Sequence, residues 1–242
     1  MYAHLKSNAT KSFSNDSNLG TICICIGDLK YVSYDYNNNI RKKLIENGLA
    51  AEFKGVEIID TCTAMFFDAM RQSNFYPEKD SVIWIHNYGT WYIWKVINDS
   101  VQLIFCEKPN DNTWITEDLI QKYLEKSQKN PDAIIYGHQV REYLFDYFSS
   151  RYNLHIFDQF NFVSGALIKA KIMAGKIKQI NALNLLGRDL KLFVGKNEIS
   201  HFEQYQTVPV GKVLRVKKNA NDMVLKVNFS LFLSTSATKL PS

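Results

Sequence analysis

The hydrophobic pattern at the start of the chain alternates between short β-favouring runs and segments with helical spacing. Residues 21–26 (TICICI) form a continuous β-favouring run, and residues 30–36 (KYVSYDY) follow after a glycine turn, so we expect a hairpin. Residues 40–48 then place their apolar positions on one helical face and end at Gly48, the expected C-cap. The first unit is therefore predicted to be strand, strand, helix.

A second strand-to-helix step follows directly. Residues 56–60 (VEIID) read as a short strand, and residues 62–73 (CTAMFFDAMRQS) favour a helix. Asp60 or Thr61 is well suited to cap this helix, because both side chains accept hydrogen bonds from free helix N–H groups.

The centre of the chain is its most apolar part. Residues 82–106 are predicted to form a hairpin turned by Asn98 and Asp99, whose first arm bends at residues 86–90 (HNYGT). Both arms are almost wholly apolar or aromatic, which is typical of strands buried on both faces. We therefore place this hairpin in the core.

The segments after the hairpin continue the alternation of helix and strand. The pattern predicts an amphipathic helix capped by Thr116, a strand that stops at Gly137, a further helix and a last short strand; these occupy residues 116–127, 132–137, 140–152 and 154–157. Together these expectations describe an α/β body with a mixed sheet and flanking helices.

Charge divides the chain into an acidic and a basic part. Lys and Arg number 16 against 20 Asp and Glu in residues 1–165, but 13 against 4 in residues 166–242. We expect a flexible polar segment over 1–19, an α/β body over 20–165 and a basic C-terminal region over 166–242, in which residues 208–234 alternate as a β-hairpin does. A basic region suits nucleic acid, anionic lipid or an acidic protein surface, and charge alone does not choose among them.

Cysteine usage and hydropathy bear on the compartment. Cys23, Cys25, Cys62 and Cys106 lie in or beside apolar runs at spacings of neither a zinc ribbon nor a redox motif, so we expect reduced thiols in a cytoplasm. The polar N-terminal segment lacks the apolar core of a secretory signal, and no apolar run reaches the length of a membrane span.

Three segments, in this order and spacing, carry a family resemblance: residues 22–34, 82–105 and 131–158. Their arrangement resembles the actin-like (ribonuclease H-like) ATPase fold, in particular its reduced branch in type IV pilus and type II secretion assembly. The resemblance implies that two hairpin turns and a later strand-glycine-helix face one nucleotide cleft. Its residues here would be Gly27, Asp28, Gly89, Thr90, Gly137 and His138.

The departures from that pattern argue against catalysis. The two aspartates expected before the phosphate turns are Cys25 and His86, and the expected glycine pair is Gly137-His138. Magnesium needs hard oxygen ligands, and phosphate cradles need backbone N–H groups that glycine leaves open. No other phosphate-binding or catalytic motif occurs in the chain. We therefore expect no catalytic residue, no metal and no cofactor.

Three other interpretations of these residues are weighed against ordinary structural roles. Asp28 would lie beside the first phosphate loop, but a Gly-Asp pair at the end of a strand is also common in ordinary turns. His86 and His138 at facing turns would suit a metal or an acid–base pair, but such histidines are usually neutral groups at strand ends. The aromatic cluster within 84–94 would suit base stacking, but Lys95 is its only neighbouring cation and alternating aromatics are usually core.

The C-terminal region adds a second resemblance. Asn184, Leu185 and Leu186 are similar to an Asn-Leu-Leu signature in pilus and secretion assembly proteins, which implies a partner-binding segment; an amphipathic helix is the plain alternative. Residues 166–180 mix basic and apolar positions, which also permits a helix near anionic lipid.

These observations predict a non-catalytic cytoplasmic scaffold at the inner face of the inner membrane. It would bind the assembly ATPase or an inner-membrane component of a type IV pilus or type II secretion-like machine. The alternatives are an active nucleotide-binding actin-like ATPase and a nucleic-acid-binding protein that uses basic residues 166–218.

Overall fold

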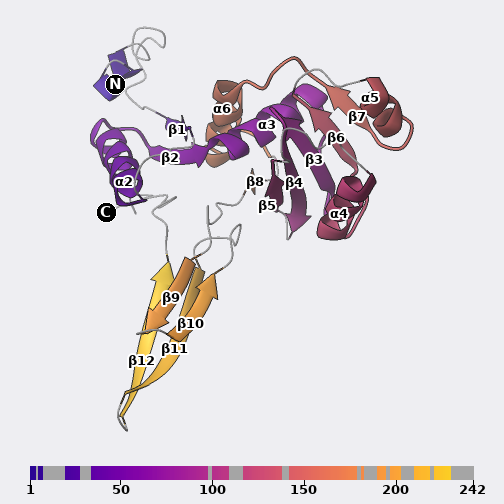
Figure 1. Cartoon of the computed structure of the whole chain (residues 1–242). Coiled ribbons are helices and arrows are strands. Elements are labelled where there is room, and N and C mark those ends of the chain that lie inside the picture. The colour runs from indigo at the N-terminus through magenta and orange to yellow at the C-terminus, as the bar shows by residue number, and fades with distance from the viewer. Residues whose placement is uncertain are drawn as a thin grey trace.

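The computed structural model is built around one mixed sheet and a second, smaller sheet beside it (Figure 1). It describes residues 1–3, 5–7, 20–27, 34–97, 100–108, 117–137, 142–178, 181–182, 190–194, 197–202, 210–218 and 221–229. The predicted α/β class, with a mixed sheet and flanking helices, is confirmed.

The larger sheet has six strands in the order β7-β6-β3-β4-β5-β8. Neighbours β3, β4 and β5 pair antiparallel, whereas β6 and β7 continue from β3 in parallel and β8 pairs in parallel with β5. The strands are β3 (Val82–Asn87), β4 (Thr90–Ile97), β5 (Ser100–Glu107), β6 (Ala133–Tyr136), β7 (Leu154–Ile156) and β8 (Asn181–Ala182).

The central hairpin differs from the prediction in one respect. Its predicted first arm is two strands, β3 and β4, which reverse at Tyr88 and Gly89 with Asn87 opposite Thr90. Both turn residues have positive φ, 46° and 78°, which is the geometry of a tight hairpin turn rather than a bend. The expected reversal at Asn98 and Asp99 lies outside the described residues, although β4 and β5 do pair antiparallel.

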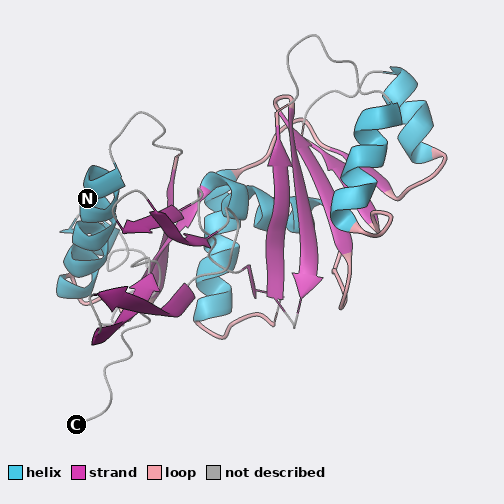
Figure 2. Ribbon diagram, turned by 60° about the horizontal axis from the view of Figure 1, so that its bottom comes forward, coloured by secondary structure: helices cyan, strands magenta, loops and turns pink. Residues whose placement is uncertain are grey.

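Helices cover both faces of the six-stranded sheet (Figure 2). Alternate residues of β3 point to opposite faces: Ile83 and Ile85 join one core cluster, and Val82 and Trp84 join the other. The first cluster includes residues of α3 (Thr61–Ser73) and α6 (Phe162–Met173), and the second includes residues of α4 (Glu117–Ser127) and α5 (Glu142–Ser149). The sheet is therefore the middle of three layers.

The smaller sheet pairs β1 (Thr21–Ile26) with β2 (Gly55–Asp60) in parallel, with α2 (Tyr34–Ala50) between them in sequence. The predicted strand over 30–36 is wrong for residues 34–36, which belong to α2, and residues 28–33 lie outside the described residues. α2 supplies the crossover connection that the parallel pair of β1 and β2 requires.

Gly48 also differs from its predicted role. It lies inside α2, which continues to Ala50, and is therefore not the C-cap. A Cβ atom at this position would lie 2.6 Å from Val56 Cγ2. Glycine is thus needed here because the helix backbone approaches β2 closely.

The described residues also include parts near the N-terminus and within the C-terminal region. Near the N-terminus, Tyr2 is buried and donates a hydrogen bond from its hydroxyl to the Leu44 carbonyl at 2.6 Å. In the C-terminal part, β9 (Leu190–Val194) pairs with β10 (Asn197–Phe202), and β11 (Val210–Lys218) pairs with β12 (Asn221–Phe229). β11 and β12 lie within the predicted hairpin of residues 208–234 and pair antiparallel, and α6 spans the predicted boundary between residues 165 and 166.

Candidate functional site

Two of the three predicted nucleotide segments meet at one end of the six-stranded sheet. β3 and β6 run parallel with His86 opposite Tyr136, and the Gly137 N–H donates to the His86 carbonyl at 2.9 Å. Gly89 and Thr90 follow shortly after β3, and Gly137 comes directly after β6. Because β3 and β6 are parallel, these residues lie at the same end of the sheet. Asp28 and His138 lie outside the described residues.

Gly27 belongs to a different place in the fold. It follows β1, whose partner is β2 in the smaller sheet, and a Cβ atom there would meet nothing within 4 Å. Residues 34–36, which were predicted to be part of the second strand of the first phosphate hairpin, belong to helix α2 instead. Among the described residues of the three segments, those of the second phosphate turn and of the adenosine segment are brought together.

The space beside Gly137 is filled by a side chain of the protein itself. A Cβ atom at Gly137 would lie 2.0, 2.4 and 2.7 Å from three ring carbons of Phe160. Phe160 itself is only 8% exposed. Phe160 is part of the core cluster that also holds Ile135, one residue before Tyr136. The glycine thus accommodates an aromatic ring of the core.

The turn between β3 and β4 is open by comparison. Tyr88 is 67% exposed, and a Cβ atom at Gly89 would lie 3.9 Å from the Lys108 Cε atom. Both turn residues adopt the left-handed backbone region that favours glycine, which accounts for Gly89 without a ligand.

The histidines of this region lie against aromatic rings. The His86 ring centroid is 4.9 Å from that of Trp91 and 4.6 Å from that of Tyr136. His155 stacks on Phe157 at an interplanar angle of 7°, and burial lowers its pKa. Within the described ranges, no group of three or more His, Cys, Asp or Glu side chains is arranged to hold a metal ion.

The aromatic cluster is core, as its alternation indicated. Trp84, Trp91 and Trp94 are all buried, and Trp84 packs edge-on against Tyr123 of α4. Tyr88 is the exception, because its side chain is exposed at the turn. Buried indoles are not accessible for stacking on nucleic-acid bases.

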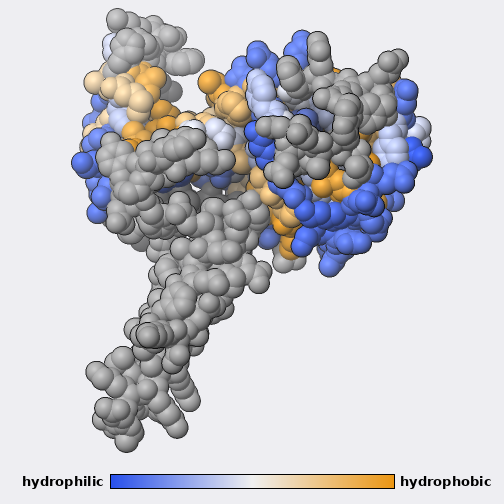
Figure 3. Space-filling model, viewed as in Figure 1, coloured by the Kyte–Doolittle hydropathy of each residue, from blue (hydrophilic) through white to orange (hydrophobic). Residues whose placement is uncertain are grey.

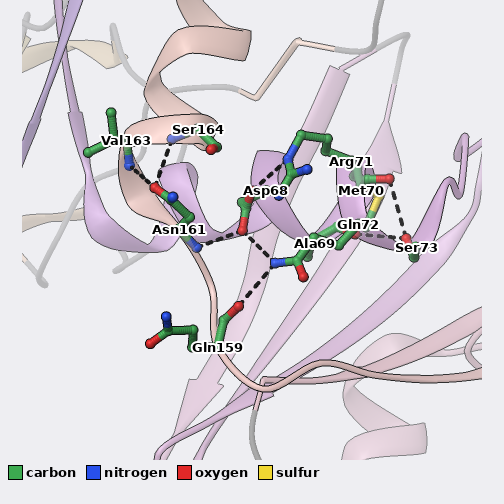
Figure 4. Close-up of polar contacts among 10 residues, drawn as sticks. All are labelled: Asp68, Ala69, Met70, Arg71, Gln72, Ser73, Gln159, Asn161, Val163 and Ser164. Carbon is green, nitrogen blue, oxygen red and sulfur yellow. Dashed lines mark hydrogen bonds and ion pairs between the residues drawn. The ribbon is translucent and has the colours of Figure 1, made fainter.

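A buried carboxylate joins two helices, which the sequence did not reveal (Figure 4). The Asp68 carboxylate accepts hydrogen bonds from Arg71 Nε at 2.9 Å, from Gln72 Nε2 at 2.7 Å and from the Asn161 N–H at 2.6 Å. Asn161 in turn caps α6, since its Oδ1 accepts from the N–H groups of Val163 and Ser164. This network fixes the start of α6 against α3 and leaves Asp68 fully paired.

A second buried polar pair links α6 to the smaller sheet. Lys169 Nζ lies 3.1 Å from Glu57 Oε1 on β2, and their side chains are 3% and 5% exposed. Lys169 Nζ also donates to the Ala182 carbonyl of β8 at 3.4 Å. Lys169, one of the basic positions in residues 166–180, is therefore paired inside the protein and does not face the surface.

Cys23 lies close to this pair and is not an activated thiol. Burial, reinforced by the Glu57 carboxylate, raises the pKa of Cys23 to about 12, and burial raises the pKa of Cys25 to about 11. Thiols react as thiolates, so both cysteines are protonated at neutral pH.

We expect alkylation of Cys23 and Cys25 by iodoacetamide at pH 7.5 to be at least about tenfold slower in the folded protein than in urea, and to accelerate as the pH rises towards 11. Peptide mass spectrometry over a time course measures both rates separately. Equal rates in the folded and unfolded chain would contradict the assignment of inert core thiols.

Asn184, Leu185 and Leu186 lie outside the described residues. Among the helices of the described ranges, none combines the length and the hydrophobicity that a bilayer crossing requires.

The site region consists of a tight turn between β3 and β4, a glycine covered by the Phe160 ring, and histidines that lie against aromatic rings. No protein-family model matches the chain, and no curated protein is similar to it at a significant level.

Proposed function

We propose that this protein is a non-catalytic binding scaffold whose body is a reduced actin-like domain. The sheet order supports the fold: strands β5-β4-β3 are antiparallel, and β6 and β7 extend from β3 in parallel through α4 and α5. Ribonuclease H-like domains have this order of strands. The segment 82–156 therefore accounts for one such half, and β1, α2 and β2 for part of a second.

The position of Phe160 carries the non-catalytic part of the proposal. In the actin-like arrangement, a strand-glycine-helix segment holds the adenosine, and Gly137 after β6 is the glycine of that segment here. Here the Phe160 ring occupies the space beside Gly137. A nucleotide would have to displace a ring that belongs to the main core cluster. Such displacement costs several kcal/mol, on the order of 3 for a buried Phe.

The partner follows from the resemblance. We place the scaffold on the cytoplasmic side of the inner membrane, bound to the assembly ATPase or an inner-membrane component of a pilus or type II secretion-like machine. Binding to such a component requires no chemical step, which agrees with the aromatic surroundings of His86 and with the paired state of Asp68.

Nucleotide binding is the second candidate, because the Gly89-Thr90 turn and Gly137 do share one end of the sheet. Isothermal titration with ATP plus magnesium separates the two functions. We expect no saturable heat up to millimolar nucleotide, since Phe160 blocks the base and Cys25 and His86 replace hard magnesium ligands.

Phe160→Ala is the informative control, checked for folding by circular dichroism. Adenosine binding by this variant alone would identify the ring as the block. Micromolar ATP binding by the unmodified protein would overturn the scaffold proposal and favour an ATPase. The assembly role is tested separately by titrating the cytoplasmic parts of co-encoded assembly components, and affinity for none of them would contradict it.

A further inference from the structure

The N-terminal segment, residues 1–7, is attached to the body through a single buried side chain. The segment contains a helical turn, in which the Leu5 N–H donates to the Met1 carbonyl at 3.0 Å. Among its described residues only Tyr2 is buried, whereas Met1 and Leu5 are 68% and 38% exposed. The segment is therefore docked by one anchor and is not packed along its whole length.

The anchor lies against α2 and the residues that follow it, at a place that we call the Tyr2 site and define by the Leu44 carbonyl, Gly48 and Phe53. The Tyr2 hydroxyl donates to the Leu44 carbonyl at 2.6 Å, and its ring centroid lies 5.9 Å from that of Phe53. A Cβ atom at Gly48 would lie 3.1 and 3.2 Å from two ring carbons of Tyr2, so a larger residue would crowd this ring. Figure 3 shows hydrophobic surface where the N-terminal turn meets α2. The site thus combines an apolar contact with one hydrogen-bond acceptor.

A charged contact lies one helical turn further along the segment. Lys6 Nζ donates to Glu52 Oε2, and this hydrogen-bonded ion pair lowers the pKa of Glu52. Tyr2 and Lys6 are four residues apart, so they lie on the same face of a helical turn. The two contacts together define a recognition pattern: a hydroxylated aromatic residue and, four positions later, a cation.

These contacts can be broken without disturbing the core. None of the described residues of segment 1–7 belongs to one of the four core clusters. The Lys6–Glu52 pair is exposed, and exposed ion pairs contribute little to stability. A helix as short as this one is not stable alone in water, so the segment would lose its docked conformation once released. Its release would uncover the Tyr2 site and leave the body folded.

We propose that the Tyr2 site is a binding site for short helical peptides that carry a hydroxylated aromatic residue and a cation one turn later, and that residues 1–7 occupy it in cis as a displaceable competitor. A ligand on the same chain has an effective concentration on the order of millimolar. The segment therefore excludes weak peptides and yields to tighter ones. This site lies on the helix of the smaller sheet, so the proposal does not depend on the nucleotide cleft or on the assembly partner.

Fluorescence anisotropy with a labelled synthetic peptide of residues 1–7 (MYAHLKS) tests the proposal on the full chain. The host variant Tyr2→Ala removes the ring that fills the site in cis, and Tyr2→Phe keeps the ring but removes the hydroxyl. We expect saturable binding to Tyr2→Ala and an apparent affinity at least about tenfold weaker for the unmodified chain, because its own segment competes. The Tyr2→Phe host should lie between them, and it replaces Tyr2→Ala if circular dichroism shows that the latter is unfolded.

Variants of the peptide identify the contacts. Tyr2→Phe in the peptide should weaken binding about fivefold, as the loss of one hydrogen bond does, and Tyr2→Ala should weaken it at least about 30-fold, as the loss of an anchor residue does. Lys6→Glu should weaken binding about threefold, and Glu52→Lys in the Tyr2→Ala host should restore it by exchanging the charges. Met1→Gln is the matched control, since Met1 is mostly exposed, and this peptide should bind like the original.

Three results would overturn the proposal. The first is the absence of saturable binding to both Tyr2 variants at millimolar peptide. The second is an equal affinity of the peptide for these variants and for the unmodified chain, which would place the peptide elsewhere on the surface. The third is a Tyr2→Ala peptide that binds as tightly as the original.

Discussion

Replacing Lys169 by Met should lower the free energy of unfolding by about 3–5 kcal/mol, because it leaves a buried carboxylate without its cation. Glu57 Oε1 lies 3.1 Å from Lys169 Nζ, and both side chains are almost fully removed from water. Met has a similar length and no charge, so the loss reports on the charge more than on packing volume.

Chemical denaturation followed by circular dichroism measures this effect, and a double variant separates its causes. Glu57→Leu with Lys169→Met removes both charges and should recover most of the stability, since a buried ion pair is often replaceable by apolar residues. Lys42→Met is the matched control: its partner Glu46 is 3.7 Å away in an exposed pair, and the expected change is below about 0.5 kcal/mol. A Lys169→Met protein within 1 kcal/mol of the unmodified one would show that water reaches Glu57.

This ion pair also connects the two sheets. Glu57 belongs to β2 of the smaller sheet, and the Ala182 carbonyl that accepts from Lys169 belongs to β8 at the edge of the larger one. α6 therefore holds both sheets through one ammonium group. Loss of that group should loosen the smaller sheet before the larger one, whose core clusters do not involve it.

The sequence pattern was most informative where local and long-range preferences agree. Strands 82–87, 90–97 and 100–107 are apolar on both faces, and two helical layers do cover them. Asp60 caps α3 as its side-chain chemistry indicated, accepting from the Thr63 N–H at 2.6 Å. In both cases the residues that define the element also make its main contacts.

Prediction failed where a distant partner decides the structure. Residues 34–36 favour β-structure locally, but they lie in α2, which connects two parallel strands. Gly137 looked like half of a nucleotide-binding pair, and nothing in the sequence signals that Phe160, 23 residues later, packs on it. Lys169 likewise resembled a surface cation because its partner Glu57 is remote in sequence.

Gly165→Ala should also destabilise the protein strongly, by about 3 kcal/mol, although alanine normally favours a helix over glycine by about 1 kcal/mol. Gly165 lies within α6 where this helix crosses α3. A Cβ atom there would lie 1.9 Å from the Ala64 carbonyl oxygen and 2.6 Å from its carbonyl carbon. Because these are backbone atoms of a packed helix, they cannot move aside as a flexible side chain does, and the two helices must separate.

Two other glycines give a graded comparison in the same denaturation experiment. Gly48→Ala in α2 meets a side-chain methyl, Val56 Cγ2, at 2.6 Å and should cost less, while Gly20→Ala has nothing within 4 Å and should be close to neutral. The α3–α6 crossing also sets the Asp68–Asn161 hydrogen bond, so Gly165→Ala should expose the amides at the start of α6 to faster hydrogen exchange. A Gly165→Ala protein as stable as Gly20→Ala would mean that α3 and α6 are not in backbone contact.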